Sequence, residues 1–391
     1  MITWARAISA RWRSLDPAWR YALGLFFALR IGLSLFAALL VSISDAPLDP
    51  DPILRPYQGI PPVQGGLAGL VLGPWQRFDG LWYLKIAQWG YSTSEDIHFP
   101  PLYPLLIRIV GSLLADQYFL AAILLSNLFY VLALLHLYRL ASREVGPAVG
   151  RRALLYLSIF PTAFFFLAPY SEPLFLLFAV ASFDHLRRGS WFWAGFWGFL
   201  ATLTRLQGWV LIFPLLYEFL QQQRGRVLRK GDLLSLGLIP AAIVFYLGLR
   251  FAWGLGPLLP MEEPSLHARI VLPWENLLYS LQTLASGRFH QADLLNLGSA
   301  VLFALFIVYS WNQLPRSYHA YLISGLLFLT MRWVETQPLN SLSRYVLGLF
   351  PAFMYLGQVG QNVIWHRVIV YSSLPLLLYL TGQFVLWGWV A

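Results

Sequence analysis

Apolar runs separated by short polar pieces recur along almost the whole chain. A helix needs about 20 predominantly apolar residues to cross the hydrocarbon core of a bilayer. By that measure the pattern predicts an all-α, polytopic transmembrane helical bundle of about eleven spans, forming one membrane domain over residues 1–391. The predicted spans are residues 21–42, 119–138, 152–168, 172–186, 190–205, 207–221, 232–253, 292–311, 318–333, 345–360 and 368–389.

Basic residues cluster between these runs, at 139–152, 187–188 and 224–230, and Arg316 and Arg367 mark two further loops. Cytoplasmic loops carry an excess of Lys and Arg, so a cytoplasmic N-terminus places all of these positions inside. Most acidic residues then fall in the opposite loops, and the C-terminus lies outside. The Arg-rich N-terminus before the first long run fits a retained signal anchor.

The first outer loop, 43–118, contains a short apolar segment, 99–114, that we do not count as a span. It holds three prolines and Arg108, and counting it would place the basic loop 139–152 outside. We therefore expect an interfacial or re-entrant helix there.

A second helix of this loop is expected within residues 75–91. Phe78, Trp82 and Trp89 fall on one helical stripe, an aromatic pattern typical of a helix in the headgroup layer. The loop is thus predicted to carry two helices that lie flat on the outer surface. A second large outer loop spans 254–291.

Composition supports the membrane assignment and narrows the partners. Hydrophobic types make up 58% of the chain and charged types 12%, too few for a soluble protein of this size. The net charge of +9 lies in topology-setting loops, so we expect membrane lipids and no nucleic acid as partners. Cysteine is absent, which excludes disulfides and thiol nucleophiles.

Asp79 is the first candidate for chemistry. A partly desolvated carboxylate near the headgroup layer can act as a general base. The alternative is a helix cap, or an ion pair with Arg77 or Lys85, and sequence physics alone slightly favours this structural role.

Two further acidic positions stay open between function and structure. Asp49 and Asp51 form a DxD that can hold a divalent metal, although solvated loop acids are the stronger reading. Glu172 sits at the end of a predicted span, where it either has a polar partner or, with Ser171 and Pro173, starts the next helix.

Arg205 and Arg344 lie at predicted outer helix ends, against the positive-inside trend. Guanidinium groups bind phosphate bidentately, so a lipid-phosphate substrate is favoured over simple contact with lipid headgroups. The sequence contains no HExxH, P-loop, dinucleotide fingerprint or nucleophile elbow, so we expect no metal site built on histidines and no cofactor.

The first-loop motifs resemble one known family. Residues 78–91, Phe-Asp-Gly-Leu-Trp-Tyr-Leu-Lys-Ile-Ala-Gln-Trp-Gly-Tyr, and 99–105, Phe-Pro-Pro-Leu-Tyr-Pro-Leu, resemble the signature of the PIG-V family. These are GPI mannosyltransferase II-like members of the GT-C superfamily. The family signature has Trp where this chain has Phe78, and a second Phe where it has Pro100.

Later segments resemble the same family. They are the segment 161–178, the Thr-Arg-Leu-Gln-Gly motif at 204–208 and the Ser-Arg-Tyr motif at 343–345. The resemblance covers roughly 75–220 well and 340–355 in part. The loop 254–291 matches no part of the family pattern.

The resemblance implies an inverting membrane glycosyltransferase. It would move a hexose, usually mannose, from a polyprenyl-phosphate sugar to a lipid-linked or membrane-proximal acceptor hydroxyl on the outer face, with Asp79 as the catalytic base. We assign Arg205 and Arg344 to the donor phosphate from their side and charge. The further candidate substrate-binding residues are Arg77, Tyr83, Tyr103, Tyr170, Glu172, Gln207 and Tyr345.

The compact chain suggests a prokaryotic member in the plasma membrane, with a lipid or glycan acceptor. Two other classes stay open. A transporter or flippase would show repeated halves and polar sites at the membrane midplane. A non-catalytic scaffold would have no access from the bilayer to Asp79.

Overall fold

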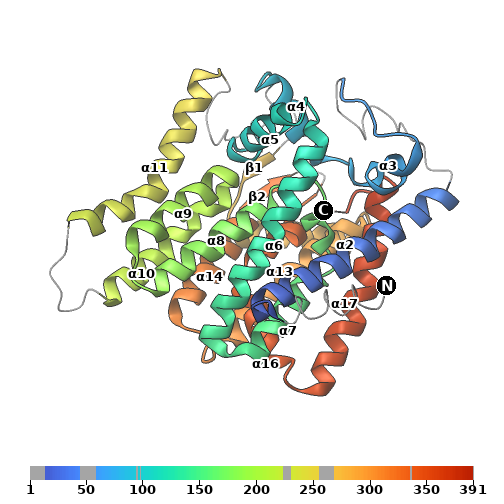
Figure 1. The fold of residues 1–391 in the computed structure, drawn as a ribbon. Coiled ribbons are helices and arrows are strands. Elements are labelled where there is room, and N and C mark those ends of the chain that lie inside the picture. The colour runs from blue at the N-terminus through green and yellow to red at the C-terminus, as the bar shows by residue number, and fades with distance from the viewer. Residues whose placement is uncertain are drawn as a thin grey trace.

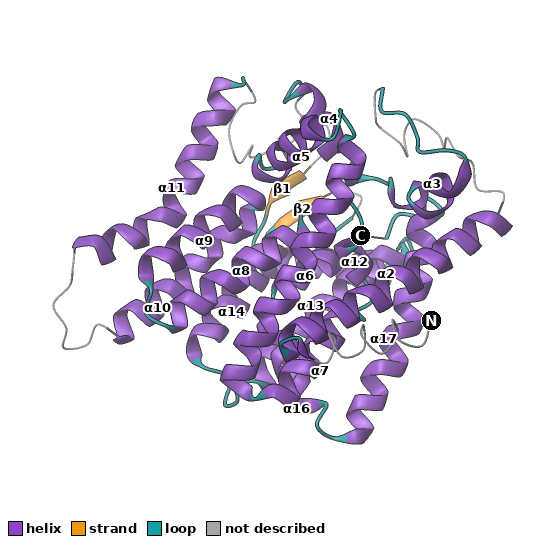
Figure 2. Ribbon diagram, in the orientation of Figure 1, coloured by secondary structure: helices purple, strands orange, loops and turns teal. Residues whose placement is uncertain are grey.

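The computed structural model describes residues 14–44, 59–93, 96, 98–222, 230–254, 268–334 and 337–390. Over these residues the chain is a bundle of helices with a short two-stranded ribbon (Figures 1 and 2). The predicted helical architecture is confirmed. Strand β1 (Ala268–Ile270) pairs antiparallel with β2 (Arg332–Val334), with Arg269 opposite Trp333.

In the described first half of the chain, helix α6 contacts most of the other helices (Figure 1). The elements of this half are α2 (Pro17–Ile43), α3 (Gly66–Val71), η1 (Gly73–Trp75), α4 (Asp79–Trp89), α5 (Leu102–Leu113), α6 (Tyr118–Val145), α7 (Pro147–Ser158), η3 (Ala163–Phe166), α8 (Glu172–Arg187) and α9 (Trp191–Thr204).

The second half completes the bundle and ends on the long helix α17. Its elements, besides the ribbon, are η4 (Leu206–Leu211), α10 (Ile212–Gln222), α11 (Lys230–Ala252), α12 (Pro273–Ala285), α13 (Gln291–Tyr309), α14 (Arg316–Thr330), α15 (Leu342–Tyr345), η5 (Val346–Gly348), α16 (Pro351–Val359) and α17 (Val363–Val385).

Among the described residues, 5 helices are long and apolar enough to cross a membrane: α2, α6, α11, α13 and α17. Each coincides with a predicted span. Helices α8, α9 and α14 also coincide with predicted spans, but they have 16, 14 and 15 residues, short of the roughly 20 that a full crossing needs. The count of about eleven spans therefore stays a prediction.

Three predicted spans, 152–168, 207–221 and 345–360, are not continuous helices. Helix α7 ends at Ser158 and a separate turn, η3, follows after Pro161, which cannot continue a helix because it lacks the N–H donor. The run 345–360 likewise divides before Pro351, where α16 begins. Irregular backbone at membrane depth is tolerated where protein covers it, and all four residues of η3 are buried.

Helix α4 packs more deeply than its aromatic stripe indicated. Most of its residues are buried. Phe78 packs on Phe384 and Trp387, and Trp82 stacks on Phe99 with ring centroids 5.8 Å apart, while Trp89 is 53% exposed. The stripe therefore contacts mainly protein. With 11 residues, α4 is about 16 Å long and cannot span a bilayer.

Helix α8 has an ionic cluster at each end. At its C-terminal end, Arg187 bridges Glu144 at 3.2 Å and Glu218 at 2.5 Å, which ties together α6, α8 and α10. Asp184, one turn earlier, accepts from Arg143 of α6. At the opposite end, Glu172 begins the helix and belongs to the site described next.

Candidate functional site

Asp79 is the first residue of α4, and its neighbours on both sides fix its position. Phe78 has φ 46°, a backbone conformation that is uncommon for a residue with a side chain and is concentrated at functional positions. A Cβ on Gly80 would lie 2.8 Å from Pro169 Cγ. Glycine therefore allows α4 to approach the segment that leads into α8.

Four charged side chains from distant parts of the sequence meet at this point. Arg344 Nη1 of α15 contacts Asp79 Oδ2 at 2.7 Å, and Arg344 Nε lies 3.2 Å from Glu172 Oε1. Arg205 Nη1, at the end of α9, contacts the same Glu172 oxygen at 2.6 Å. Carboxylates and guanidinium groups thus alternate, and their formal charges cancel.

The four side chains differ in their access to solvent. The side chains of Glu172 and Arg344 are 4% and 3% exposed, and that of Arg205 is 11% exposed. The Asp79 side chain is 20% exposed. Asp79 is therefore the carboxylate of this cluster that a hydroxyl group can most readily reach, while Glu172 holds the two arginines.

Tyr345 lies against both arginines. The Arg205 and Arg344 guanidinium carbons stand 4.3 Å and 4.8 Å from its ring centroid, and Arg344 Nη2 donates to its hydroxyl at 3.0 Å. The ring and the hydroxyl together fix the direction of both cations.

The start of α8 joins the cluster to α4. Ser171 Oγ accepts from Arg205 Nη1 at 3.2 Å and hydrogen-bonds the Tyr83 hydroxyl at 2.7 Å, instead of capping its own helix. Glu172 lies in the first turn of α8 and Pro173 follows it, but the polar partners of the Glu172 side chain are the two arginines and not the backbone at the start of the helix.

Two further predicted site residues, Tyr103 and Tyr170, lie next to this arrangement and hold it in place. The Tyr103 hydroxyl hydrogen-bonds Ser126 Oγ at 2.6 Å, and that serine donates to the Tyr170 carbonyl at 3.0 Å. The Tyr170 ring centroid is 5.5 Å from the Arg344 guanidinium carbon. Tyr170 therefore borders the cluster directly, and Tyr103 holds its backbone.

Arg77 does not join the cluster. Its guanidinium donates to the carbonyl oxygens of Gly73 and Val385, each at 2.9 Å, and lies 4.2 Å from the Trp387 ring centroid. Gln207 is buried and packs closely against Gly348. A Cβ added to Gly348 would lie 2.7 Å from the Nε2 atom of Gln207.

The structural alternative for Asp79, an ion pair with Arg77 or Lys85, is not what the structure shows. Lys85 pairs with Asp96 at 3.0 Å, and Arg77 reaches the carbonyl oxygens above. Sequence reasoning gave no role to Asp96, which lies between α4 and α5. Its carboxylate accepts from the backbone N–H groups of Ser92 and Thr93 as well. A buried acid that closes its own loop leaves no periodic signal in the sequence.

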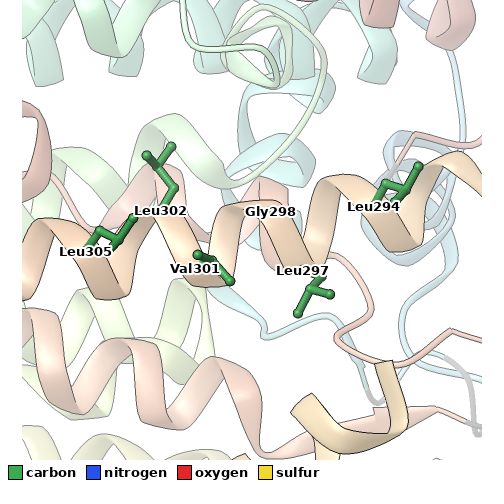
Figure 3. Close-up of a pocket in the computed structure, with 6 residues that line it drawn as sticks. All are labelled: Leu294, Leu297, Gly298, Val301, Leu302 and Leu305. Atoms are coloured by element: carbon green, nitrogen blue, oxygen red, sulfur yellow. The ribbon is translucent and has the colours of Figure 1, made fainter. Parts of the chain in front are cut away.

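A hollow of about 470 Å³ lies along α13, and no residue of the charged cluster lines it (Figure 3). It is lined by Leu294, Leu297, Gly298, Val301, Leu302 and Leu305. It carries no titratable side chain, and we interpret it as part of the apolar face of a candidate membrane span. Asp49 and Asp51 lie outside the described residues. Within those residues, no group of three or more acidic or histidine side chains is placed to hold a metal ion.

Comparison with known proteins identifies the family. A family model described as "Mannosyltransferase (PIG-V)" matches residues 22–225, more than half of the chain. The chain belongs to the mannosyltransferase (PIG-V) family. The family predicted from the sequence motifs is therefore confirmed, and with it the assignment to the glycosyltransferases.

Two relatives of the chain are GPI alpha-1,6-mannosyltransferase 2 of Cricetulus griseus and of Rattus norvegicus. The first is 32% identical over 165 residues, which is 40% of this chain and 32% of that protein. The second is 31% identical over 162 residues, 39% of this chain and 33% of that protein. The chain thus spans about a third of the length of these relatives.

Crystal structures of Archaeoglobus fulgidus oligosaccharyltransferase are also similar. The complex with Zn and sulfate has a TM-score of 0.45 at 14% identity, over 90% of this chain and 53% of that chain. The apo form has a TM-score of 0.42 at 12% identity, over 93% and 56%. The PIG-V family match itself contains Asp79, Glu172 and Arg205 and ends before Arg344.

Proposed function

We propose that this chain transfers a hexose, with mannose the expected sugar, from a polyprenyl-phosphate donor to an acceptor hydroxyl, and that Asp79 is the general base. The observation that carries the proposal is the contact of Asp79 with Arg344 at 2.7 Å, within a cluster that contains a second arginine. A base for the acceptor and cations for a phosphate therefore stand side by side.

The chemistry needs one protein base. The acceptor oxygen attacks the anomeric carbon, and its proton passes to the Asp79 carboxylate as the bond from carbon to oxygen forms. The bond between the anomeric carbon and the phosphate oxygen breaks, and polyprenyl phosphate leaves with the electron pair. Attack opposite the leaving group inverts the anomeric centre.

Arg344 and Arg205 stabilise the phosphate on which negative charge develops. Each guanidinium is paired with a carboxylate, which favours its charged form. An incoming phosphate competes with Asp79 for Arg344. Donor binding would thereby loosen the ion pair and leave the carboxylate to the acceptor.

Membership of the mannosyltransferase (PIG-V) family favours an enzyme over a transporter, a flippase or a scaffold. We further propose that the cluster faces the outer side of a prokaryotic plasma membrane, with the N-terminus in the cytoplasm, and that the acceptor is lipid-linked or membrane-proximal. The arginines at the C-terminal end of α8, Arg187 and Arg188, with Arg143 of α6 beside them, support this orientation, because cytoplasmic loops carry an excess of basic residues.

Purified protein in liposomes, supplied with labelled polyprenyl-phosphate-mannose and a membrane lipid extract, tests the function directly. We expect labelled mannose to move to an extractable acceptor with inversion at the anomeric carbon. Retention of the anomeric configuration would contradict the single-base mechanism. If instead the labelled lipid crossed the bilayer unchanged, the protein would be a flippase.

A further inference from the structure

Three buried polar side chains at the junction of α13 with α15, the helix that carries Arg344, have no role in the chemistry described above. They are Asp293 and Asn296, one turn apart near the start of α13, and Ser343 of α15. Their exposed fractions are 3%, 1% and 1%. Helix residues three positions apart are neighbours on one face, so Asp293 and Asn296 lie together.

Hydrogen bonds fix each of these residues, and His290 Nδ1 also lies 3.7 Å from Asp293 Oδ2. Asp293 Oδ2 accepts from the His290 backbone N–H at 2.8 Å. Asn296 Oδ1 accepts from the Ser343 backbone N–H at 2.9 Å, which joins α13 to α15. The Ser343 carbonyl oxygen accepts from Thr162 Oγ1 at 2.7 Å.

Each also keeps one polar atom that has no hydrogen-bond partner among the described residues. These atoms are Asp293 Oδ1, Asn296 Nδ2 and Ser343 Oγ. An unpaired polar atom in the interior is costly, and the great majority of such atoms are paired. By contrast Asn276, equally buried, uses its amide nitrogen for two carbonyl oxygens and its amide oxygen for the Leu339 N–H.

The unpaired atoms offer a matched set of an acceptor, a donor and a hydroxyl that can do either. That set complements neighbouring hydroxyl groups on a sugar ring. Its position supports the donor sugar in particular, because Ser343 directly precedes Arg344, the cation that we assign to the donor phosphate. In the donor lipid the sugar ring is bonded to that phosphate.

We propose that Asp293, Asn296 and Ser343 form a subsite that binds hydroxyl groups of the transferred sugar. This inference rests on the proposed function. The subsite distinguishes the sugar-bearing donor from the released polyprenyl phosphate, which has no sugar to fill it. The product is then bound more weakly than the donor and leaves the site.

Two substitutions remove the unpaired atoms and keep the fixing hydrogen bonds. Ser343→Ala deletes the hydroxyl and leaves both backbone contacts. Asn296→Asp keeps an oxygen for the Ser343 N–H and replaces the unpaired donor by an acceptor. Ser34→Ala is the matched control, because Ser34 of α2 is also buried and its hydroxyl is also without a partner among the described residues.

The test measures dissociation constants of polyprenyl-phosphate-mannose and of polyprenyl phosphate for protein in nanodiscs. We expect the wild type to bind the mannose-bearing lipid more tightly. In Ser343→Ala and Asn296→Asp that lipid should bind about 5- to 50-fold more weakly, with polyprenyl phosphate within about twofold of wild type. Ser34→Ala should match the wild type for both lipids.

Unchanged affinity for the mannose-bearing lipid in both variants would overturn the subsite and assign the unpaired atoms to buried water. An effect confined to the KM of the acceptor would overturn the assignment to the donor sugar. A wild-type protein that binds neither lipid would overturn the proposed function itself, and this outcome is separate from the first two.

Discussion

Arg344 contacts both carboxylates of the site. Its Nη1 reaches Asp79, its Nε lies beside Glu172, and its Nη2 donates to Tyr345. A planar guanidinium offers donors in several fixed directions, whereas a lysine ammonium is a single point charge on a flexible stem. The geometry of the site therefore requires arginine at this position, not merely a positive charge.

We expect Arg344→Lys to lower kcat/KM for sugar transfer by about 10²-fold, because the phosphate and Asp79 lose their common, rigid partner. The matched control is Arg316→Lys. Arg316 is exposed, at the start of α14, and donates to the Trp311 carbonyl oxygen. Transfer kinetics of both variants check the prediction, and near-normal activity of Arg344→Lys would remove Arg344 from the donor site.

At this scale the sequence brought forward four residues that meet in the structure, but it did not predict how they pair. Asp79, Glu172, Arg205 and Arg344 were each chosen from local context and the family motifs. The partner of Asp79, however, lies 265 positions away, and no local pattern reports such a contact. Arg77, which is near Asp79 in the sequence, is not its partner, because the guanidinium of Arg77 donates instead to the Val385 carbonyl oxygen at the end of α17.

Among the elements, α4 carries the proposed base and is held at two points. Gly80 lets it approach Pro169, and the buried pair of Lys85 with Asp96 fixes its middle to a residue between α4 and α5. Both side chains of that pair are at most 4% exposed. The position of Asp79 therefore depends on contacts made by its own helix.

Gly80→Ala should displace α4, because the added methyl group would lie 2.8 Å from Pro169 Cγ. We expect a loss of kcat of about 10-fold or more from misplacement of Asp79, with the donor dissociation constant little changed. Gly237→Ala in α11 is the control, since its Cβ meets nothing within 4 Å. Equal activity of the two variants would show that the close approach does not matter.

Asp96→Asn should destabilise the protein, because it leaves the Lys85 ammonium buried without a counter-charge. Removing one partner of a buried pair costs about 3–5 kcal/mol. The control is Asp16→Asn. The pair of Asp16 with Arg139 is exposed, and asparagine can still cap α2 as Asp16 does. Thermal unfolding in detergent should show a lower midpoint for Asp96→Asn alone, and equal midpoints would contradict this role.

Hydropathy located the long elements and failed where helices are interrupted. Runs such as 119–138 and 292–311 appear as α6 and α13. The runs 152–168 and 345–360 are as apolar, but Pro161 and Pro351 divide them, and the broken turns survive because neighbouring helices cover them. Burial by distant elements is not visible in a hydropathy window.

At the scale of the whole molecule, α8 connects the two ionic clusters that lie at its ends. Its 16 residues span about 24 Å, with the site at Glu172 and the Arg187 network at the other end. Basic residues at the second end fit the cytoplasmic side. The two ends are therefore expected to face opposite aqueous compartments.

Single cysteines can test this orientation without background, because the chain contains none. Arg288→Cys lies on the exposed turn between α12 and α13, and Arg316→Cys on the exposed start of α14. In intact cells a membrane-impermeant maleimide should label the first and spare the second. The reverse pattern would place the active site on the cytoplasmic side.

The central claim is that Asp79 takes the proton of the acceptor hydroxyl. The most direct measurement compares single-turnover mannose transfer and donor binding for the wild type and Asp79→Asn, which keeps the shape and removes the basicity. We predict that the transfer rate falls by about 10²–10⁴-fold. Donor affinity should stay equal or increase, since the phosphate no longer competes with Asp79 for Arg344. Transfer at the wild-type rate by Asp79→Asn would contradict the account.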